Sequence, residues 1–158
     1  SETSTGAYHC DMDYMAETVR ELRSEGYLPI VTFQHEERYE WSPNAQMIRD
    51  FGIVLEAGAV IASGSQAHQP HYAEFVHDGF AHYGLGNLFF DQYGVEEYTD
   101  WAFIDRHVFY NGKHISTEVL TIRFLDLVKA TWARSEQRVE MLEMLFDTAR
   151  MRWQDDEP

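Results

Sequence analysis

The alternation of helical and strand patterns over the first 63 residues restricts the fold more than any other feature of the sequence. Residues 11–25 predict an amphipathic helix, and residues 28–34 predict a short buried strand. A second helix is predicted to open at Ser42-Pro43, and residues 59–63 predict a second buried strand that enters a turn at Gly64. Because the connections are short, we expect an α/β fold whose strands are parallel and joined by right-handed crossovers.

The pattern changes after residue 75, where antiparallel hairpins replace the alternation. Residues 75–90 predict one hairpin, turning at His77-Asp78-Gly79, and residues 102–124 predict another, turning at Asn111-Gly112. Residues 136–153 predict a helix with apolar side chains on one face, and the tail after it is expected to fray. We therefore expect one domain over residues 1–134, followed by a helix and tail over 135–158.

The charge of the chain limits its partners. There are 27 acidic and 12 basic residues, so the formal net charge is −15. This charge disfavours nucleic acid and anionic membranes as partners, and chemistry on phosphate would need metal ions to make the site locally positive. No apolar run is long enough to span a bilayer, so no membrane span is expected in this chain. The small polar start at Ser1 is interpreted as a cut end, from which the compartment cannot be read.

Two histidines are the sharpest candidates for a metal site. His35 follows the first predicted strand, and His68 follows the second. Ligands of open α/β sheets bind at the carboxyl ends of the strands, so we expect the two side chains to approach each other there. Each would be a neutral imidazole ligand with its tautomer fixed by a neighbouring carboxylate or carbonyl. The alternative is a pair of hydrogen-bonded loop histidines, since their spacing fits no short metal motif.

Several polar residues near these histidines have two interpretations each. An acidic cluster could supply a general acid or base or a hard-metal ligand, or it could be a solvated loop; it comprises Glu36, Glu37 and Glu40. Gln66 could offer a carbonyl oxygen to a metal or orient a neighbour, and His71 is a weaker site neighbour. Asn87, with Gly84 and Gly86, could bring backbone close to a site or form a bulge. The aromatic residues Phe89, Phe90 and Tyr93 could form a stacking platform, but they are expected in the core.

Residues 12–92 resemble the C-terminal half of the CapA/PgsA-like family of poly-gamma-glutamate capsule biosynthesis proteins. The most specific motif is Tyr83-Gly84-Leu85-Gly86-Asn87-Leu88-Phe89-Phe90-Asp91-Gln92, which is similar to the family's Tyr-Ser-Leu-Gly-Asn-Phe-x-Phe-Asp-Gln. The strand that ends at His35 and the segment leading to His68 match two further family motifs. Gln66 stands where many relatives have histidine, Ala67 replaces the usual proline, and Glu36-Glu37 replace Trp-Gly.

The resemblance implies a metal-dependent enzyme. The family belongs with calcineurin-like metallophosphoesterases, so it implies a four-layer αββα sandwich of which this chain is about half. It carries His35 and His68 over as ligands of divalent metal ions (manganese, iron, zinc or magnesium). The implied function is phosphoesterase-type chemistry in extracellular polymer or envelope metabolism, located outside the cell or at the envelope. The alternative is a non-catalytic scaffold with a degenerate metal site.

The resemblance also implies a partner. The family's Gly-Asp, Asn-Leu-Glu and Asn-Asn-His-x-x-Asp motifs, which would supply the other metal ligands, do not occur in this sequence. We therefore expect association with the N-terminal half of the same domain, as a separate chain or a removed segment, and no activity from this chain alone. Formation of a homo-oligomer is left open.

Overall fold

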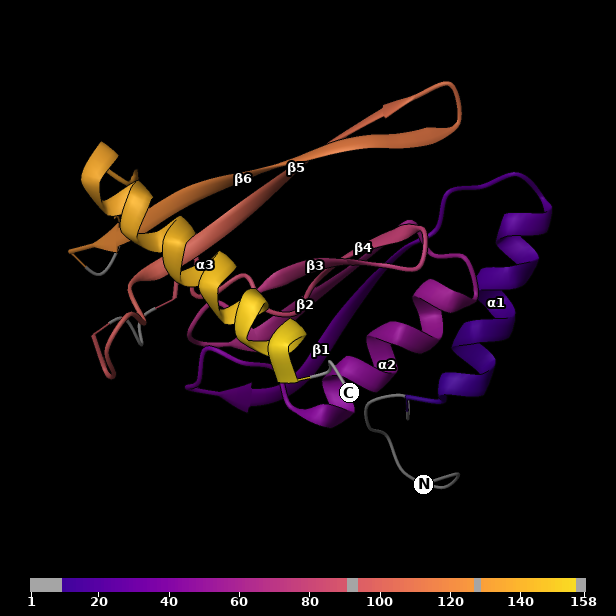
Figure 1. The fold of residues 1–158 in the computed structure, drawn as a ribbon, viewed down its shortest axis with the longest axis horizontal. Coiled ribbons are helices and arrows are strands. Elements are labelled where there is room, and N and C mark those ends of the chain that lie inside the picture. The colour runs from indigo at the N-terminus through magenta and orange to yellow at the C-terminus, as the bar shows by residue number, and fades with distance from the viewer. Residues whose placement is uncertain (1–9, 91–93, 127–128, 156–158) are drawn as a thin grey trace.

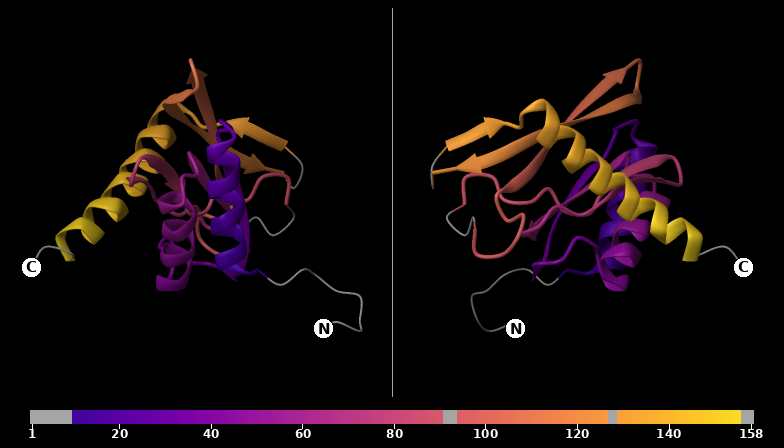
Figure 2. Two further views of the ribbon diagram at one scale, coloured as in Figure 1. Left: turned by 90° about the vertical axis from the view of Figure 1, so that its right-hand side faces the viewer. Right: turned by 60° about the vertical axis from the view of Figure 1, so that its left-hand side comes forward.

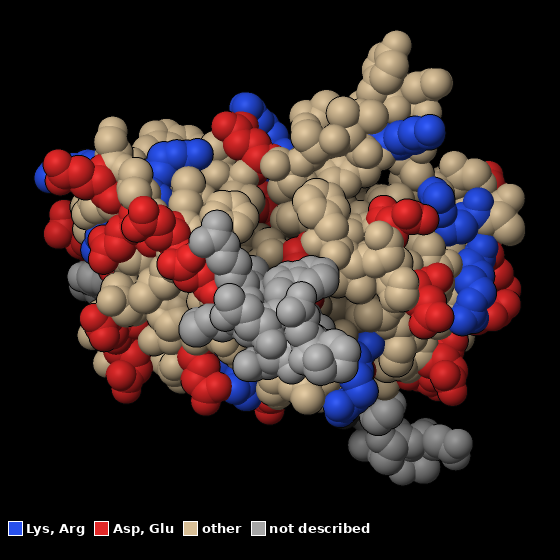
Figure 3. All heavy atoms as spheres, viewed as in Figure 1, with Lys and Arg blue, Asp and Glu red and all other residues tan. Residues whose placement is uncertain are grey.

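The computed structural model describes residues 10–90, 94–126 and 129–155 (Figure 1). The elements, in chain order, are α1 (Met12–Ser24), β1 (Ile30–Arg38), α2 (Ala45–Glu56), β2 (Ile61–Ala67), β3 (Ala73–Val76), β4 (Gly79–His82), β5 (Trp101–Tyr110), β6 (Lys113–Leu125), β7 (Lys129–Trp132) and α3 (Ser135–Asp155). Among these residues, no helix combines the length and apolarity that crossing a bilayer requires. Acidic side chains are spread over the face seen in Figure 3, with fewer basic ones between them.

The first sheet has the order β1-β2-β4-β3, with β1 at one edge. The pairs β1–β2 and β2–β4 are parallel, as the sequence pattern predicts. β3 and β4 form an antiparallel hairpin around His77 and Asp78, which confirms the predicted turn. Side chains cap both α1, which precedes β1, and α2, which connects β1 to β2: Asp11 accepts a hydrogen bond from the backbone of Tyr14, and Asn44 accepts one from Met47.

The residues of β4 show how the layers are stacked. A Cβ atom at Gly79 would lie 2.6 Å from the Leu55 side chain, so this face of β4 lies against α2. On the opposite face, Phe80 packs edge-on against His107, and His82 bonds to Asp105 of β5. Because side chains alternate along a strand, β4 is buried on both faces, and the first sheet lies between α2 and the second sheet.

The second sheet is antiparallel, with the order β5-β6-β7, and its long hairpin projects beyond the first sheet (Figures 1 and 2). The turn at Asn111-Gly112 has positive φ at both residues, 49° and 71°, which confirms the predicted hairpin. α3 packs against β3 and β6, and it buries Met141 and Leu145 completely. The structure is therefore mixed α/β in two sheets, while the complete four-layer sandwich stays a prediction.

Three local predictions were wrong. β2 continues through Gly64 to Ala67 because Gly64 lets the strand pass close to the backbone: a Cβ atom there would lie 2.0 Å from the Tyr83 carbonyl oxygen. The N-cap of α2 is Asn44 rather than Ser42, since Asn44 reaches the free N–H of Met47. β1 runs on to Arg38, so His35 lies within the strand rather than after it.

The motif after β4 also differs from its prediction. The hairpin strand ends at His82, and the following described residues are irregular, with an isolated bridge from Gly86 to Ala102. Phe89 and Phe90 are 71% and 41% exposed, so they are not core residues. They follow the end of β4, in a segment that belongs to neither sheet, and Phe89 makes an edge-to-face contact with Phe124 of the second sheet. Tyr93 lies outside the described residues.

Candidate functional site

The candidate site lies where β1 and β2 end. His68 directly follows β2, and its backbone N–H donates to the Arg38 carbonyl at the end of β1, at 2.8 Å. Two residues earlier, Gln66 has φ 77°, in the left-handed region that side chains other than glycine rarely occupy. Such backbone strain is typical of positions where the chain must aim a particular side chain. The strand end is thus shaped to place His68 at the carboxyl edge of the sheet.

Asn87 fixes the orientation and tautomer of the His68 ring. The Asn87 Nδ2 amide donates to the Thr99 carbonyl at 2.9 Å, so Oδ1 is the atom that faces His68. His68 Nδ1 lies 2.8 Å from that oxygen and must therefore carry the proton. Both side chains are buried, at about 5% exposure. In a neutral ring, the lone pair is consequently on Nε2.

The carboxylate of Glu37 lies on the Nε2 side of His68. Glu37 Oε1 is 3.3 Å from His68 Nε2, and it also accepts a hydrogen bond from the Tyr39 hydroxyl at 2.8 Å. That bond to an anion is the main reason why the pKa of Tyr39 is raised. A nitrogen lone pair and a carboxylate oxygen repel each other unless a proton or a cation lies between them. The arrangement therefore suits either an imidazolium–carboxylate pair or a shared cation.

Two aromatic rings hold the His68 imidazole between them. Tyr39 stacks on it at a centroid distance of 4.8 Å, and Phe90 stacks at 5.2 Å, each within 27° of parallel. Stacked rings restrict rotation of the imidazole and exclude water from its faces. Phe90 is partly exposed, but it contributes to the site. The sequence had indicated a core position for this residue.

His35 has a different set of partners. Its Nε2 lies 2.8 Å from Asp50 Oδ2 of α2, and Gln46 donates to the other Asp50 oxygen. Because a carboxylate only accepts, His35 Nε2 carries the proton and the neutral ring keeps its lone pair on Nδ1. Histidines that bind metals are commonly oriented by a carboxylate in this way. That His35 and His68 share one metal stays a prediction.

Within the described ranges, no group of three or more histidine, cysteine, aspartate or glutamate side chains is placed to hold a metal ion. In the acidic cluster of residues 36–40, the two carboxylates other than that of Glu37 have structural partners. Glu36 bonds to Arg38 and Asn44, and Glu40 pairs with Arg38. Gln66 accepts a hydrogen bond from Gln34 at 3.0 Å. The described residues therefore offer pairs of ligands rather than a complete set.

His71 is completely buried and packs against Gly84, where a Cβ atom would lie 3.1 Å from its ring. Burial, followed by the nearby positive charge of Arg38, lowers the pKa of His71 to about 4. Backbone groups of Glu40 and Tyr83 lie near the ring, yet no described residue completes a hydrogen bond to either ring nitrogen. His71 is thus a neutral packed side chain, and Gly84 makes room for it.

Sequence reasoning missed Asp50 and the buried pair His82–Asp105, whose Nδ1 and Oδ2 atoms are 2.7 Å apart. One signal was available for Asp50: it lies among Met47, Phe51 and Val54 on the buried face of α2, where a lone carboxylate needs a partner. The pair His82–Asp105 joins residues 23 apart on different sheets, and no local pattern reveals it.

The fold and the site define an α/β protein with a candidate ligand-binding edge, formed where two parallel strands present oriented histidines. Residues 1–92 match the bacterial capsule synthesis protein family, PGA_cap, and the chain belongs to that family. The resemblance inferred from the motifs is thereby confirmed. Membership in a capsule synthesis family favours association with the cell envelope. No curated protein is matched.

Proposed function

We propose that this chain carries the histidine-bearing half of a divalent-metal site in a phosphoesterase-type enzyme of capsule or envelope polymer metabolism. The observation that supports the proposal is the Asn87–His68–Glu37 arrangement, because it directs the lone pair of a buried imidazole at a half-exposed carboxylate. Asn87 fixes the tautomer of His68, and the His68 Nε2 and Glu37 Oε1 atoms face each other. A ligand histidine held in this way by an outer residue is common in protein sites for divalent metals.

The residues fit such a metal in type. His68 and Glu37 would hold it directly, and His35 with its Asp50 partner is the further ligand that the family resemblance implies. Bound there, the metal would supply Lewis acidity toward a phosphoryl oxygen. The chain's own residues orient the imidazoles, exclude water from the His68 ring and place the Tyr39 hydroxyl beside Glu37.

The second candidate is a non-catalytic scaffold of the same family. It is favoured by Gln66, which stands where a ligating histidine would be expected and instead bonds to Gln34. It is also favoured by the absence of a three-ligand cluster among the described residues. The two candidates differ in whether the assembled protein binds metal.

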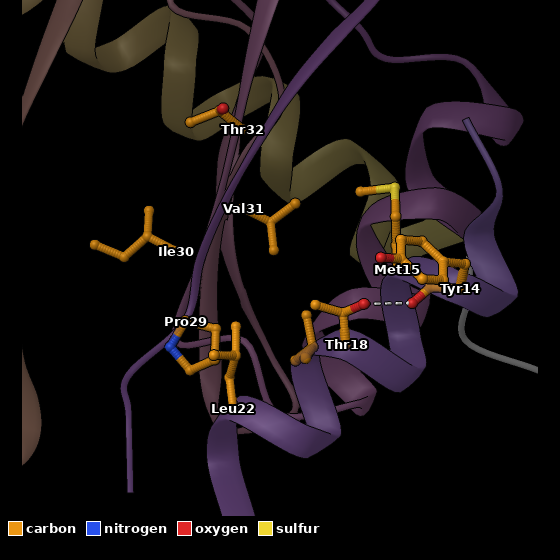
Figure 4. A pocket seen from close by; sticks show the side chains of 9 residues that line it. Tyr14, Met15, Thr18, Leu22, Pro29, Ile30, Val31 and Thr32 are labelled. Atoms are coloured by element: carbon orange, nitrogen blue, oxygen red, sulfur yellow. Dashed lines mark hydrogen bonds between the residues drawn. The ribbon is translucent and has the colours of Figure 1, made fainter. Parts of the chain in front are cut away.

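We further propose that β1 pairs with a strand of the remaining half of the domain. β1 is an edge strand, and Ile30 on it is 52% exposed. Beside it, an apolar pocket of about 360 Å³ opens between α1 and β1, where Met15, Thr18 and Val31 face one another (Figure 4). An unpaired strand edge next to exposed apolar side chains is the usual receiver of an added strand.

The test compares metal content and turnover in the assembled protein, purified with any polypeptide that accompanies it. His68→Ala and the milder Glu37→Gln, which changes a half-exposed side chain, should each lower bound metal measured by mass spectrometry. They should also lower manganese-dependent hydrolysis of bis(4-nitrophenyl) phosphate, by roughly tenfold or more. The exposed His77→Ala is the matched control and should change neither quantity.

If the wild-type assembly binds no metal, the scaffold candidate replaces the enzyme. If metal is bound but Glu37→Gln and His68→Ala leave both metal content and rate unchanged, the metal site lies elsewhere and this assignment is wrong.

A further inference from the structure

A second pocket lies at the second sheet, and its lining contains no residue of the candidate site around His35 and His68. It has a volume of about 450 Å³, within the range of small-molecule sites, and it is formed by β6, β7 and the start of α3. Its described lining residues are Arg123, Leu125, Lys129, Thr131, Trp132, Arg134 and Gln137. In a chain with more than twice as many acidic as basic residues, three of these seven are basic and none is acidic.

The strand register explains why the basic side chains converge. Arg123 pairs with Thr131, and Leu125 pairs with Lys129, across the antiparallel β6–β7 ladder. Residues directly opposite each other and two apart share one face of a sheet, so these four side chains project together. Arg134 lies two residues after the end of β7, directly before α3, and lines the same pocket.

Two of the three basic side chains are available to a ligand. Among the described residues, neither Lys129 nor Arg134 takes part in an ion pair. Arg123 is held by Asp100, with its Nε 2.7 Å from Asp100 Oδ2, and it lies over the Trp101 ring at 5.7 Å. Asp100 offsets part of the Arg123 charge, which leaves a net positive pocket.

The rest of the lining adds apolar and hydrogen-bonding surface. Leu125, which is paired with Lys129 and shares its face, is 41% exposed. The Gln137 side-chain oxygen accepts the Arg134 backbone N–H at 3.1 Å, so its amide donors remain for a ligand. Donors and positive charge beside an exposed apolar side chain suit an anion that carries an apolar part.

We propose that this pocket binds an organic anion through Lys129 and Arg134, with the apolar part of the ligand against Leu125. The ligand class is a carboxylate or a phosphate ester or phosphonate attached to a hydrocarbon or ring. This site is independent of the proposed metal site, because no residue of β1, β2 or α2 contributes to it.

The test is isothermal titration calorimetry at low salt on the protein as purified, including any accompanying polypeptide. The probes are phenylphosphonate and phthalate, which are dianions on a phenyl ring, and benzamide, which is neutral. At least one dianion should bind, and its affinity should fall with added salt. Lys129→Gln and Arg134→Gln, both at exposed positions, should each weaken binding about tenfold, which corresponds to about 1.4 kcal/mol. Lys113→Gln, which removes an equal charge at the far hairpin turn, should leave binding within twofold.

Binding of phenylphosphonate alone would identify a phosphate-type ligand, and binding of phthalate alone a carboxylate-type ligand; either outcome supports the pocket. Absence of binding by both dianions overturns the proposal. Equal binding of benzamide, or equal weakening by Lys113→Gln, also overturns it, because the pocket would then be a nonspecific apolar or charged surface.

Discussion

Replacement of Asn87 by alanine tests the central feature of the candidate site. The change removes the acceptor for His68 Nδ1–H and the donor to the Thr99 carbonyl, both at about 5% exposure or less. A buried polar group left without a partner costs about 1–3 kcal/mol. Two such groups should lower the free energy of unfolding by roughly 2–6 kcal/mol, and for an m value near 2 kcal/mol/M the urea midpoint should fall by about 1–3 M.

Two measurements check this reasoning. Urea unfolding of Asn87→Ala is compared with Gln34→Ala, which removes an exposed amide with one hydrogen bond to Gln66 and should cost less than about 0.5 kcal/mol. Nitrogen-15 NMR of the wild type should show the neutral His68 ring protonated at Nδ1. A loss below 0.5 kcal/mol in Asn87→Ala, or a proton on Nε2, would refute the proposed tautomer and the lone pair directed at Glu37.

Three further outcomes are expected. Burial lowers the pKa of His71 from 6.5 to about 4, so the unfolded chain binds more protons between those pH values, and the free energy of unfolding should rise with pH across this window by up to roughly 3 kcal/mol. His71→Leu should flatten this dependence in urea titrations, whereas the exposed His77→Leu should not. Gly64→Ala should lower the free energy of unfolding by about 3 kcal/mol or more, because its Cβ would meet a backbone carbonyl at 2.0 Å, while Gly52→Ala, in open space on α2, should raise it by roughly 0.5–1 kcal/mol. Ile30→Lys at the exposed edge should leave the urea midpoint unchanged but reduce copurification of a partner polypeptide on size-exclusion columns.

The parts of the fold that depend on local pattern could be predicted from the sequence. Apolar periodicity placed both early helices, although the N-cap of α2 was predicted two residues too early. The Asn111-Gly112 dipeptide placed the long hairpin, because each of these signals depends on neighbours in the chain. The end of β2 could not be placed in the same way. Gly64 indicates a turn in isolation, and it belongs to a strand only because the backbone at Tyr83 approaches it closely.

In the candidate site, too, local patterns could be predicted from the sequence and contacts between distant residues could not. The motif containing Asn87 and the position of His68 after a strand were visible in the sequence, and the structure joins them by a hydrogen bond. Glu37 was one of three neighbouring acidic residues that sequence alone could not separate. The irregular end of β1, where the register with β2 shifts between Gln34 and Arg38, selects Glu37 for the His68 side.

The two buried faces of β4 have a consequence for cooperativity. This four-residue strand packs on α2 with one face and on β5 with the other, and the side chains of Phe80 and His82 are almost completely covered by the second sheet. Unfolding the second sheet alone would expose a buried aromatic ring and separate the buried pair His82–Asp105. The two sheets should therefore melt in one transition. Residues 1–92, which match the capsule synthesis family, are consequently shorter than the unit that folds. The reason is that β4 lies within this region, whereas β5, which covers one face of β4, lies beyond it.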